Sequence, residues 1–500
     1  MRRKFVSDMI DNKDLATWND GDRIFIEAGT GQGKSHWVKN VLYELAKGMD
    51  DKILFFVHRA RTKDQFIQEL QGKSDIIDVR TYQALENHLS PNSNVKDENR
   101  INLSDYKYII CDECQYFIDD GNFNNFTDIS LDTILDTNSI VIFMTATSED
   151  IKWYLENVKH IELIEYGQMI NYNFINKNLL QYTKDTELFD FIDNILENTD
   201  DKILVFCERA KDCCNYYKRY KEYSLFLCGK SSLAKYGKYI EEDKINNMLE
   251  NEKFKERILF TTTCLDAGAN LKDEKIKHIV IDRVVNINTI KQCLGRRRFL
   301  ENEVDGRGYK TKINLIFRGK TKFELNNDLK NTRSILNLVD LFNEDREEFN
   351  KIQFRKNRDS IFYENTEGET VYNKLVYYSK YCRELKLNEI LKVGHVNYIQ
   401  QQLRIKCIRN LSEIYHKGVN KMKHKDNDLI QVFIDKYKTE KLYKDDRDEL
   451  IRLCGITDSR GRKQKSVSSI SGYLQANYGV KVESTKVKEN GKLITVWIIV

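Results

Sequence analysis

Two short segments of this 500-residue chain combine residue types that could hold phosphate groups and a divalent cation. The first, AGTGQGKS, covers residues 28–35 and follows a short apolar run. Glycines let successive backbone N–H groups point towards phosphate oxygens, and a helix that follows adds the positive end of its dipole. In such a loop Lys34 reaches the terminal phosphates and the Ser35 hydroxyl holds Mg²⁺. The predicted phosphate-binding residues are Gly29, Thr30, Gly31, Gln32, Gly33, Lys34 and Ser35.

The second segment is YKYIICDEC (106–114), in which an apolar run ends in the adjacent acids Asp112 and Glu113. Ligands of α/β sheets bind at the carboxyl ends of parallel strands, so acids at this place can face a phosphate loop. Asp112 can hold Mg²⁺, and Glu113 can orient or deprotonate an attacking water. Cys111 and Cys114 form a CxxC pair here, but no second pair at zinc spacing lies nearby, and the acids give the better interpretation.

A parallel sheet is needed to position these residues, and the first 320 residues have the pattern of two. Short apolar runs alternate with amphipathic stretches, which is typical of strands joined by crossover helices. The first block has such runs at residues 24–29, 53–57, 76–82, 106–111 and 140–147. The second block has them at residues 203–208, 224–229, 258–263, 278–283 and 313–318. Two similar α/β domains, joined near residues 150–178, are therefore predicted.

Five segments in sequence order resemble the superfamily 2 helicases of the DEAD/DEAH-like kind. They are GTGQGKS (29–35), DECQ (112–115), TAT (145–147), TTTCLDAGAN (261–270) and QCLGRRR (292–298). The resemblance covers roughly residues 20–320. It implies two tandem RecA-like domains with ATP and Mg²⁺ between them and nucleic acid lying across both. Some similar helicases carry an iron–sulphur cluster, but residues 36–110 contain no cysteine to hold one.

The resemblance also implies individual roles. Glu113 matches the catalytic base, and Gln292, Arg296 and Arg298 belong to the last motif. That motif usually has an arginine where this chain has Phe299, so which of the consecutive arginines reaches the γ-phosphate stays open, and Arg297 is expected at the surface or on nucleic acid. The remaining implied residues are Thr145 and Thr147 for coupling hydrolysis to domain movement, Asp266 and Gly268 at the nucleotide, and Arg59, Thr81, Thr262 and Thr263 on the nucleic-acid strand.

The charge of the chain is unevenly distributed. Residues 371–500 contain 26 Lys and Arg against 14 Asp and Glu, whereas residues 1–370 contain 55 against 63. A basic segment on an acidic body favours contact between the C-terminal part and a polyanion. A lysine-rich surface that is merely solvated is the alternative, and charge alone does not separate the two.

The last 60 residues resemble a winged helix. Residues 445–456 and 466–479 are expected to be helices, and residues 481–500 to be two strands around the turn signal Asn490-Gly491. The second helix would approach a groove of DNA and the hairpin would contact its backbone. The predicted nucleic-acid contacts here are Arg460, Arg462, Lys463 and Lys465, and the alternative is a small packing domain with a solvated basic face.

The predicted fold class is thus α/β, with two tandem RecA-like P-loop domains followed by a mainly helical region and a winged-helix-like domain. The predicted boundaries are 1–165 for the ATP-binding domain, 166–325 for the second RecA-like domain, 326–440 for the helical accessory region and 441–500 for the nucleic-acid-binding domain.

The predicted function is that of an ATP-dependent helicase or translocase with ATP and Mg²⁺ as cofactors. Single-stranded DNA is the favoured partner, alongside proteins of replication, recombination or defence. An RNA helicase and a DNA-binding ATPase switch or loader are the alternatives. No apolar run approaches the ~20 residues that cross a bilayer, so a cytoplasmic location is expected. Frequent Lys, Asn and Ile with one proline are typical of an AT-rich genome, such as that of a low-GC bacterium or its phage.

Overall fold

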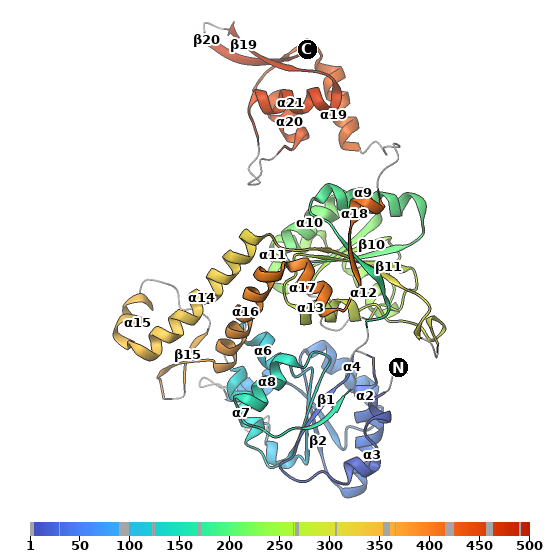
Figure 1. Cartoon of the computed structure of the whole chain (residues 1–500), viewed down its shortest axis with the longest axis vertical. Helices are drawn as coiled ribbons and strands as arrows, with labels where there is room; N and C mark the ends of the chain where they lie inside the picture. The colour runs from blue at the N-terminus through green and yellow to red at the C-terminus, as the bar shows by residue number, and fades with distance from the viewer. Residues whose placement is uncertain are drawn as a thin grey trace. The chain divides into compact units, whose positions relative to one another are not determined.

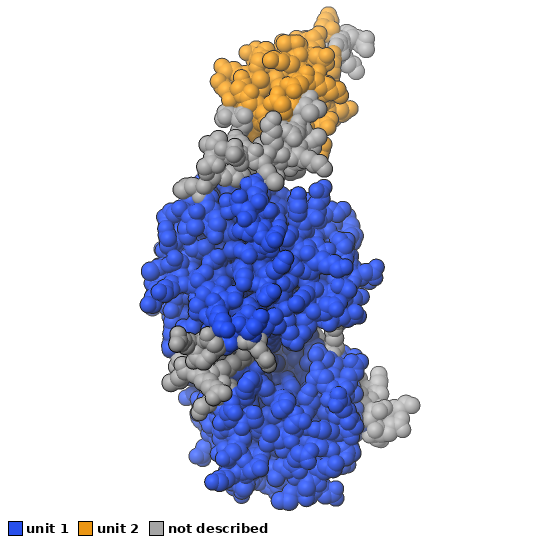
Figure 2. All heavy atoms as spheres, turned by 90° about the vertical axis from the view of Figure 1, so that its right-hand side faces the viewer, with its two compact units in different colours: residues 1–415 blue, residues 416–500 orange. Residues whose placement is uncertain are grey.

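The computed structural model of the chain forms two compact units, residues 1–415 and 416–500 (Figure 2). The residues that it describes are 5–29, 31–89, 100–122, 124, 126–167, 172–263, 265, 270–305, 308–353, 361–365, 367–415, 425–456, 464–489 and 492–500. Within these ranges, no helix has both the length and the apolar character needed to cross a membrane.

The first domain of the larger unit is a parallel six-stranded sheet with strand order β3-β2-β4-β5-β1-β6 (Figure 1). Its strands are β1 (Arg23–Glu27), β2 (Ile53–Val57), β3 (Ile77–Thr81), β4 (Tyr108–Asp112), β5 (Ile140–Thr145) and β6 (Ile164–Gly167). Its helices are α1 (Asn12–Leu15), α2 (Lys34–Trp37), α3 (Tyr43–Met49), α4 (Ala60–Leu70), α5 (Tyr82–Leu89), α6 (Tyr116–Asp119), α7 (Thr127–Leu135) and α8 (Glu149–Asn157). Because core clusters cover both faces of the sheet, the interior positions of its central strands are apolar.

The second domain is a parallel seven-stranded sheet with strand order β17-β7-β14-β11-β8-β10-β9. Its strands are β7 (Ile175–Gln181), β8 (Lys202–Cys207), β9 (Ser224–Leu227), β10 (Ile258–Thr262), β11 (Ile276–Asp282), β14 (Ile313–Arg318) and β17 (Cys407–Asn410). Its helices are α9 (Asp185–Asn198), α10 (Ala210–Arg219), α11 (Leu233–Tyr236), α12 (Glu242–Asn251) and α13 (Ile287–Gly295), and β12 (Val304–Asp305) pairs with β13 (Gly308–Tyr309) beside it.

The predicted fold class of two tandem parallel-sheet α/β domains is confirmed, and all ten predicted apolar runs form strands. In the described parts of the two parallel sheets, three strands were not predicted: β6, β7 and β17. The side chains of β6 and β17 are mostly exposed, because each strand lies at the edge of its sheet and buries little. An edge strand with little buried surface has no apolar run by which the sequence could reveal it.

The region after β14 connects the two domains. It contains α14 (Lys322–Glu344), α15 (Arg346–Gln353), β15 (Phe362–Glu364), β16 (Thr370–Tyr372), α16 (Lys374–Val393), α17 (His395–Gln402) and α18 (Leu411–Ile414). Leu375 and Tyr378 of α16 belong to the core of the first domain, whereas Leu387 and Ile390 belong to that of the second. The part of the predicted accessory region 326–440 that belongs to the larger unit is therefore built into both domains, and it adds the strand β17 to the second sheet.

The smaller unit contains α19 (Lys425–Tyr437), β18 (Lys441–Leu442), α20 (Lys444–Cys454), α21 (Val467–Tyr478), β19 (Val482–Glu489) and β20 (Lys492–Ile499). The strands form an antiparallel sheet in the order β18-β20-β19. The two helices and the hairpin occur where the sequence predicted them, although Asn490 and Gly491 lie outside the described residues. The unit begins before the predicted boundary at 441, because Phe433 and Ile434 of α19 pack in its core with Leu450 and Trp497.

Candidate nucleotide site

The glycine-rich loop joins β1 to the helix that begins at Lys34, as the sequence predicted. Gly31 and Gly33 have φ values of 79° and 80°, a left-handed conformation that glycine adopts without steric cost. The Gln32 side chain accepts a hydrogen bond from the backbone N–H of Gly29, and the Gln32 carbonyl accepts one from Val6. The positive φ values curl the loop, and the two hydrogen bonds of Gln32 hold it in that conformation. Thr30 lies outside the described residues.

Lys34 and the acids of β4 meet beyond the carboxyl ends of β1 and β4. These two strands are separated only by β5, so their ends lie on the same edge of the sheet. The Lys34 Nζ donates to the carbonyl oxygen of Ala28 at 3.0 Å and lies 3.5 Å from Glu113 Oε1. The two halves of the predicted phosphate site are thus in direct contact.

Asp112 is half-buried, and its Oδ1 is a buried atom with no hydrogen-bond partner among the described residues. Burial, together with the neighbouring Glu113, raises the pKa of Asp112 to about 7, and the charge of Lys34 opposes this shift. An ionised carboxylate only accepts, and Mg²⁺ prefers oxygen ligands. Asp112 therefore fits a magnesium site, with the Ser35 hydroxyl in the same cleft as the second ligand.

A chain of hydrogen bonds leads away from Glu113. The Gln115 Nε2 donates to Glu113 Oε2 at 2.9 Å, Thr145 Oγ1 donates to Gln115 Oε1 at 2.5 Å, and the backbone N–H of Thr147 donates to Thr145 Oγ1 at 2.9 Å. Burial disfavours the charged form of Glu113, but Lys34, Gln115 and Arg296 outweigh it and hold the Glu113 pKa below its usual value. Glu113 is thus oriented and ionised, as a general base requires.

A cleft of about 720 Å³ brings together residues from both domains. The first domain contributes Ser35, Asp112 and Glu113. The second domain contributes Gln292 of α13, and Arg296 and Arg298, which follow α13. Arg296 is buried, whereas Arg298 donates from Nε to the Asn270 side-chain oxygen at 2.8 Å. The three places that the sequence assigned to one triphosphate therefore converge on one cleft.

Arg297, expected at the surface or on nucleic acid, is instead buried. Its guanidinium pairs with Glu303 and lies 4.5 Å from the centre of the Phe299 ring. The expectation was wrong because three consecutive arginines at the end of a helix point in different directions. Arg297 faces the core of the second domain, while Arg296 and Arg298 line the cleft.

Among the predicted nucleic-acid contacts, Arg59, Thr262 and Thr263 line the cleft. Thr81 is not among the lining residues, and its hydroxyl accepts a hydrogen bond from the backbone N–H of Ala84 at 3.2 Å in the first turn of α5. In the smaller unit Lys465 is exposed. The predicted residues that lie outside the described ranges are Asp266, Gly268, Arg460, Arg462 and Lys463.

One side of the cleft was not predicted from the sequence. Asp150 of α8 and several residues of α16 also line it, namely Ser379, Lys380, Cys382, Arg383 and Lys386. These α16 residues belong to no motif, and their distance along the chain from the phosphate loop gave no sign that they approach it. Asn270 was also missed as the partner of Arg298, although it belongs to the segment TTTCLDAGAN that carries the resemblance.

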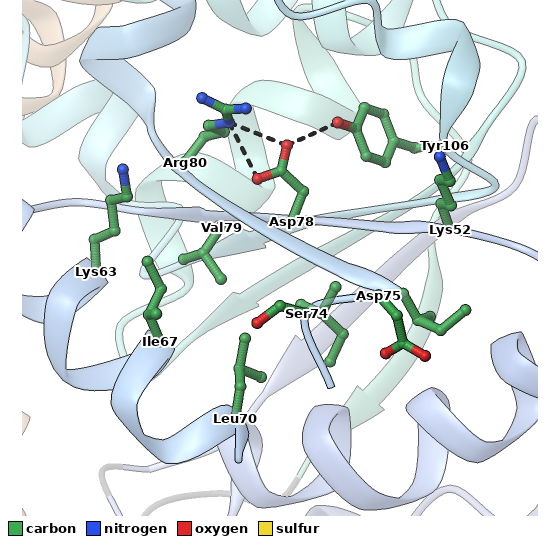
Figure 3. A pocket seen from close by; sticks show the side chains of 12 residues that line it. Lys52, Lys63, Ile67, Leu70, Ser74, Asp75, Asp78, Val79, Arg80 and Tyr106 are labelled. Atoms are coloured by element: carbon green, nitrogen blue, oxygen red, sulfur yellow. Dashed lines mark hydrogen bonds and ion pairs between the residues drawn. The ribbon is translucent and has the colours of Figure 1, made fainter. Parts of the chain in front are cut away.

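A second pocket, of about 550 Å³, lies beside the edge strand β3 (Figure 3). Its most polar side chains bind one another: Arg80 Nε donates to both carboxylate oxygens of Asp78, and the Tyr106 hydroxyl donates to Asp78 Oδ2 at 2.8 Å. Because this polar cluster already satisfies its own hydrogen bonds, the interdomain cleft is the better candidate site.

No protein-family model and no curated protein matches the sequence. Solved structures with a similar fold include the following three. One is the DEAD-box helicase Mss116 bound to ssRNA and UDP-BeF, at 14% identity over 64% of this chain and 71% of that chain, with a TM-score of 0.45. Another is S. cerevisiae Dbp5 bound to RNA and ADP BeF3, at 12% identity over 60% and 80%, with a TM-score of 0.43. The third is a DEAD box protein from the hyperthermophile Methanococcus jannaschii, at 14% identity over 79% and 89%, with a TM-score of 0.35.

Proposed function

We propose that the protein is an ATP-driven motor on nucleic acid, a helicase or translocase that acts on DNA. The observation that carries this proposal is the cleft that Ser35, Asp112 and Glu113 of one domain line together with Arg296 of the other, while Lys34 contacts Glu113. A phosphate site shared by two domains changes when the γ-phosphate leaves, and this change can move the domains relative to each other.

The side chains at the cleft suit phosphoryl transfer to water. Lys34 would neutralise the terminal phosphates, and Ser35 and Asp112 would hold Mg²⁺, which supplies charge neutralisation on the phosphate oxygens. Glu113, fixed by Gln115, would accept the proton of the attacking water. Arg296 would stabilise the charge that develops on the transferred group, and its burial strengthens this interaction because water is excluded.

The first test is ATP hydrolysis by the full chain with single- and double-stranded DNA and RNA of equal length. We expect stimulation by single-stranded DNA, and binding that weakens with salt at a log–log slope of about −0.7 per phosphate neutralised. Hydrolysis at the same rate with and without every nucleic acid would exclude a motor. Stronger stimulation by RNA would favour the RNA helicase.

The second test is strand displacement. Wild type is expected to separate a partial duplex when ATP is present, and Lys34→Ala is the matched variant that lacks the phosphate-binding ammonium. If wild type hydrolyses ATP in a DNA-dependent way but displaces no strand, the protein is a switch, loader or pure translocase rather than a helicase.

The smaller unit supports DNA as the partner. Its elements follow in the order helix, strand, helix, helix, strand, strand, which is the order of a winged helix, and α20 packs against α21. Exposed lysines occur at residue 465 before α21 and at residues 486 and 488 along β19. We therefore propose that α21 approaches a groove and that the β19–β20 hairpin contacts backbone phosphates.

Charge reversal tests this role in the full chain. Lys486→Glu with Lys488→Glu is expected to weaken duplex DNA binding and to lower the salt slope by about 2, because each phosphate-contacting lysine adds about 1. Lys351→Glu on α15, also an exposed lysine, is the control. Equal binding by the double variant and the control would show that the hairpin is only a solvated surface.

A further inference from the structure

Helix α16 is connected along the chain to the second domain, but its side chains contact both domains. The chain leaves the second sheet at β14, runs through α14 and α15 to α16, and returns through α17 to β17 in the same sheet. With 20 residues α16 is about 30 Å long, because each helical residue adds about 1.5 Å. Figure 1 shows α16 beside α14, and α16 also contacts α6 and α8 of the first domain.

The N-terminal half of α16 is anchored on the first domain. Leu375 is fully buried there, and Tyr378 stacks on Trp153 of α8 with ring centres 5.5 Å apart and planes 7° apart. The Asn373 side chain donates to Thr127 Oγ1 at 2.9 Å, and the backbone N–H of Lys374 donates to Asp128 Oδ2 at 3.1 Å. We call this contact the brace, defined as the packing of Asn373, Lys374, Leu375, Tyr378 and Lys386 of the second domain on the first domain.

The brace reaches the segment that is expected to couple hydrolysis to movement. Helix α8 begins directly after Thr145–Thr147, whose hydrogen bonds lead through Gln115 to Glu113. In its first turn Asp150 accepts two hydrogen bonds from Lys386 Nζ, at 2.6 and 2.7 Å. The neighbouring Glu149 lies 3.6 Å from Lys291 on α13, the helix that Arg296 directly follows. Each acid of this turn thus contacts a different element of the second domain.

We infer that Asp150 and Lys386 are positioning residues that hold the two domains in the arrangement where Glu113 and Arg296 line one cleft. This inference rests on the proposed function, because it assigns the pair to the ATP reaction. The N-terminal half of α16 packs on the first domain without a direct covalent connection to it, because the chain on both sides of α16 leads to the second sheet. Opening the cleft therefore has to break the brace, and closing it has to remake the Asp150–Lys386 pair.

The geometry of the pair supports a role in positioning. Both side chains are about three-quarters buried, and both carboxylate oxygens of Asp150 bind the same ammonium group. A pair that is partly shielded from water interacts more strongly than one on an open surface. Asp150 and Lys386 also line the cleft, so their contact forms only when the cleft is closed.

A charge-swap cycle tests the inference. Asp150→Lys and Lys386→Glu each place like charges together, so the closed arrangement becomes less populated and the KM for ATP rises about five-fold with a smaller change in kcat. The double variant Asp150→Lys/Lys386→Glu restores the opposite charges and should return KM to within about two-fold of wild type. Lys386→Met is the milder second variant, which removes the charge while keeping the length of the side chain.

The matched control is the pair Arg333–Glu384, which joins α14 to α16 at 2.6 Å within the second domain. Arg333→Glu, Glu384→Arg and their double variant should leave KM for ATP unchanged. If both single variants of the Asp150–Lys386 pair also leave it unchanged, or if the double variant is no better than the single ones, the inference is wrong.

Trp153 supplies a readout that does not depend on hydrolysis. Its emission, taken as the difference between each protein and the same protein with Trp153→Phe, should shift in the single charge variants without nucleotide and return in the double variant. An unchanged signal would contradict the brace. Failure of the proposed function would look different, since wild type itself would then hydrolyse no ATP with any nucleic acid while the Trp153 shift persisted.

Discussion

The first and second sheets each end a central strand in an aspartate, and the burial and the partners of the two aspartates differ. In the second sheet Asp282, at the end of β11, binds Arg318 at the end of β14 through two hydrogen bonds of 2.7 and 2.6 Å. The Tyr216 hydroxyl also donates to Asp282, and Arg318 contacts Asp185. In the first sheet Asp112, at the end of β4, has one oxygen without a partner in the part of the chain that the structure describes.

This difference shows how one architecture can serve two purposes. A buried carboxylate is stable only when a cation or hydrogen-bond donors compensate its charge. The second sheet supplies the cation from its own chain, so its strand ends form a closed structural cluster. In the first sheet, Asp112 keeps an oxygen that the proposed Mg²⁺ would bind. The second domain lines the cleft with the arginines that follow α13 as well as with Thr262 at the end of β10.

The largest expected effect concerns the contribution of the second domain. Arg296→Ala should lower kcat for ATP hydrolysis by about 10³–10⁵ while ATP still binds, because an arginine that stabilises the transferred phosphoryl group contributes about this much. Arg298→Ala should lower kcat by a smaller factor, because the Arg298 guanidinium already donates a hydrogen bond to Asn270. Steady-state hydrolysis and binding of a fluorescent ATP analogue measure both. Near-normal hydrolysis in both variants would remove the arginine finger from the second domain.

Next in size is the general base of the first sheet. Glu113→Gln keeps the size of the side chain and can still bind Gln115, but it cannot accept a proton. We expect kcat to fall by about 10²–10⁴ with little change in ATP binding. Single-turnover hydrolysis measures the chemical step. A loss of less than ten-fold would mean that Glu113 only orients the loop, and the contrast between the two sheets would then rest on Asp112 alone.

The closed cluster of the second sheet predicts an effect on stability rather than on chemistry. Arg318→Met removes the cation and leaves Asp282 buried and uncompensated, which should destabilise the second domain by about 3–5 kcal/mol. Denaturant unfolding measures this loss. Asp282→Asn with Arg318→Met is the control, and it should recover part of the stability because no buried charge remains. Equal stability of wild type and Arg318→Met would show that the cluster is not structural.

The smallest effect comes from Asp128 of α7, a buried carboxylate that accepts backbone hydrogen bonds from Ile129 and Lys374. Burial raises the pKa of Asp128 to about 6, above its usual value of 3.8, and these hydrogen bonds oppose the shift. A raised folded-state pKa stabilises the folded protein at low pH, and this contribution is lost as the pH rises through about 6.

Asp128→Asn does not titrate at this position and therefore isolates the effect. Relative to this variant, wild type should be more stable at pH 5 than at pH 7.5 by about 1 kcal/mol, since one pKa unit corresponds to about 1.4 kcal/mol. Thermal unfolding of both proteins at the two pH values measures the difference. A difference that does not change with pH would mean that Asp128 is ionised in the folded protein at both values.

Much of the fold and of the nucleotide site could be predicted because each feature is local. The interior positions of the strands β1, β2, β4 and β5 are apolar. The phosphate loop lies within a few consecutive residues, and so do the two acids at the end of β4. Arg297 was placed wrongly because its direction depends on which side of a helix end faces the core. The edge strands β6 and β17 were missed because exposed strands have the composition of loops.

The sequence by itself determined two parallel sheets, the loop that curls at Gly31 and Gly33, and the acids that follow β4, because glycine conformation and strand burial act between near neighbours in the chain. The convergence of Glu113 and Arg296 on one cleft was indicated only by the resemblance of their motifs, and the tertiary structure brings the two residues together. Only the tertiary structure decided that α16 crosses from the second domain to Asp150 of the first. These contacts join residues far apart in the chain, and they depend on how the helices of two separate cores pack together, which no local pattern encodes.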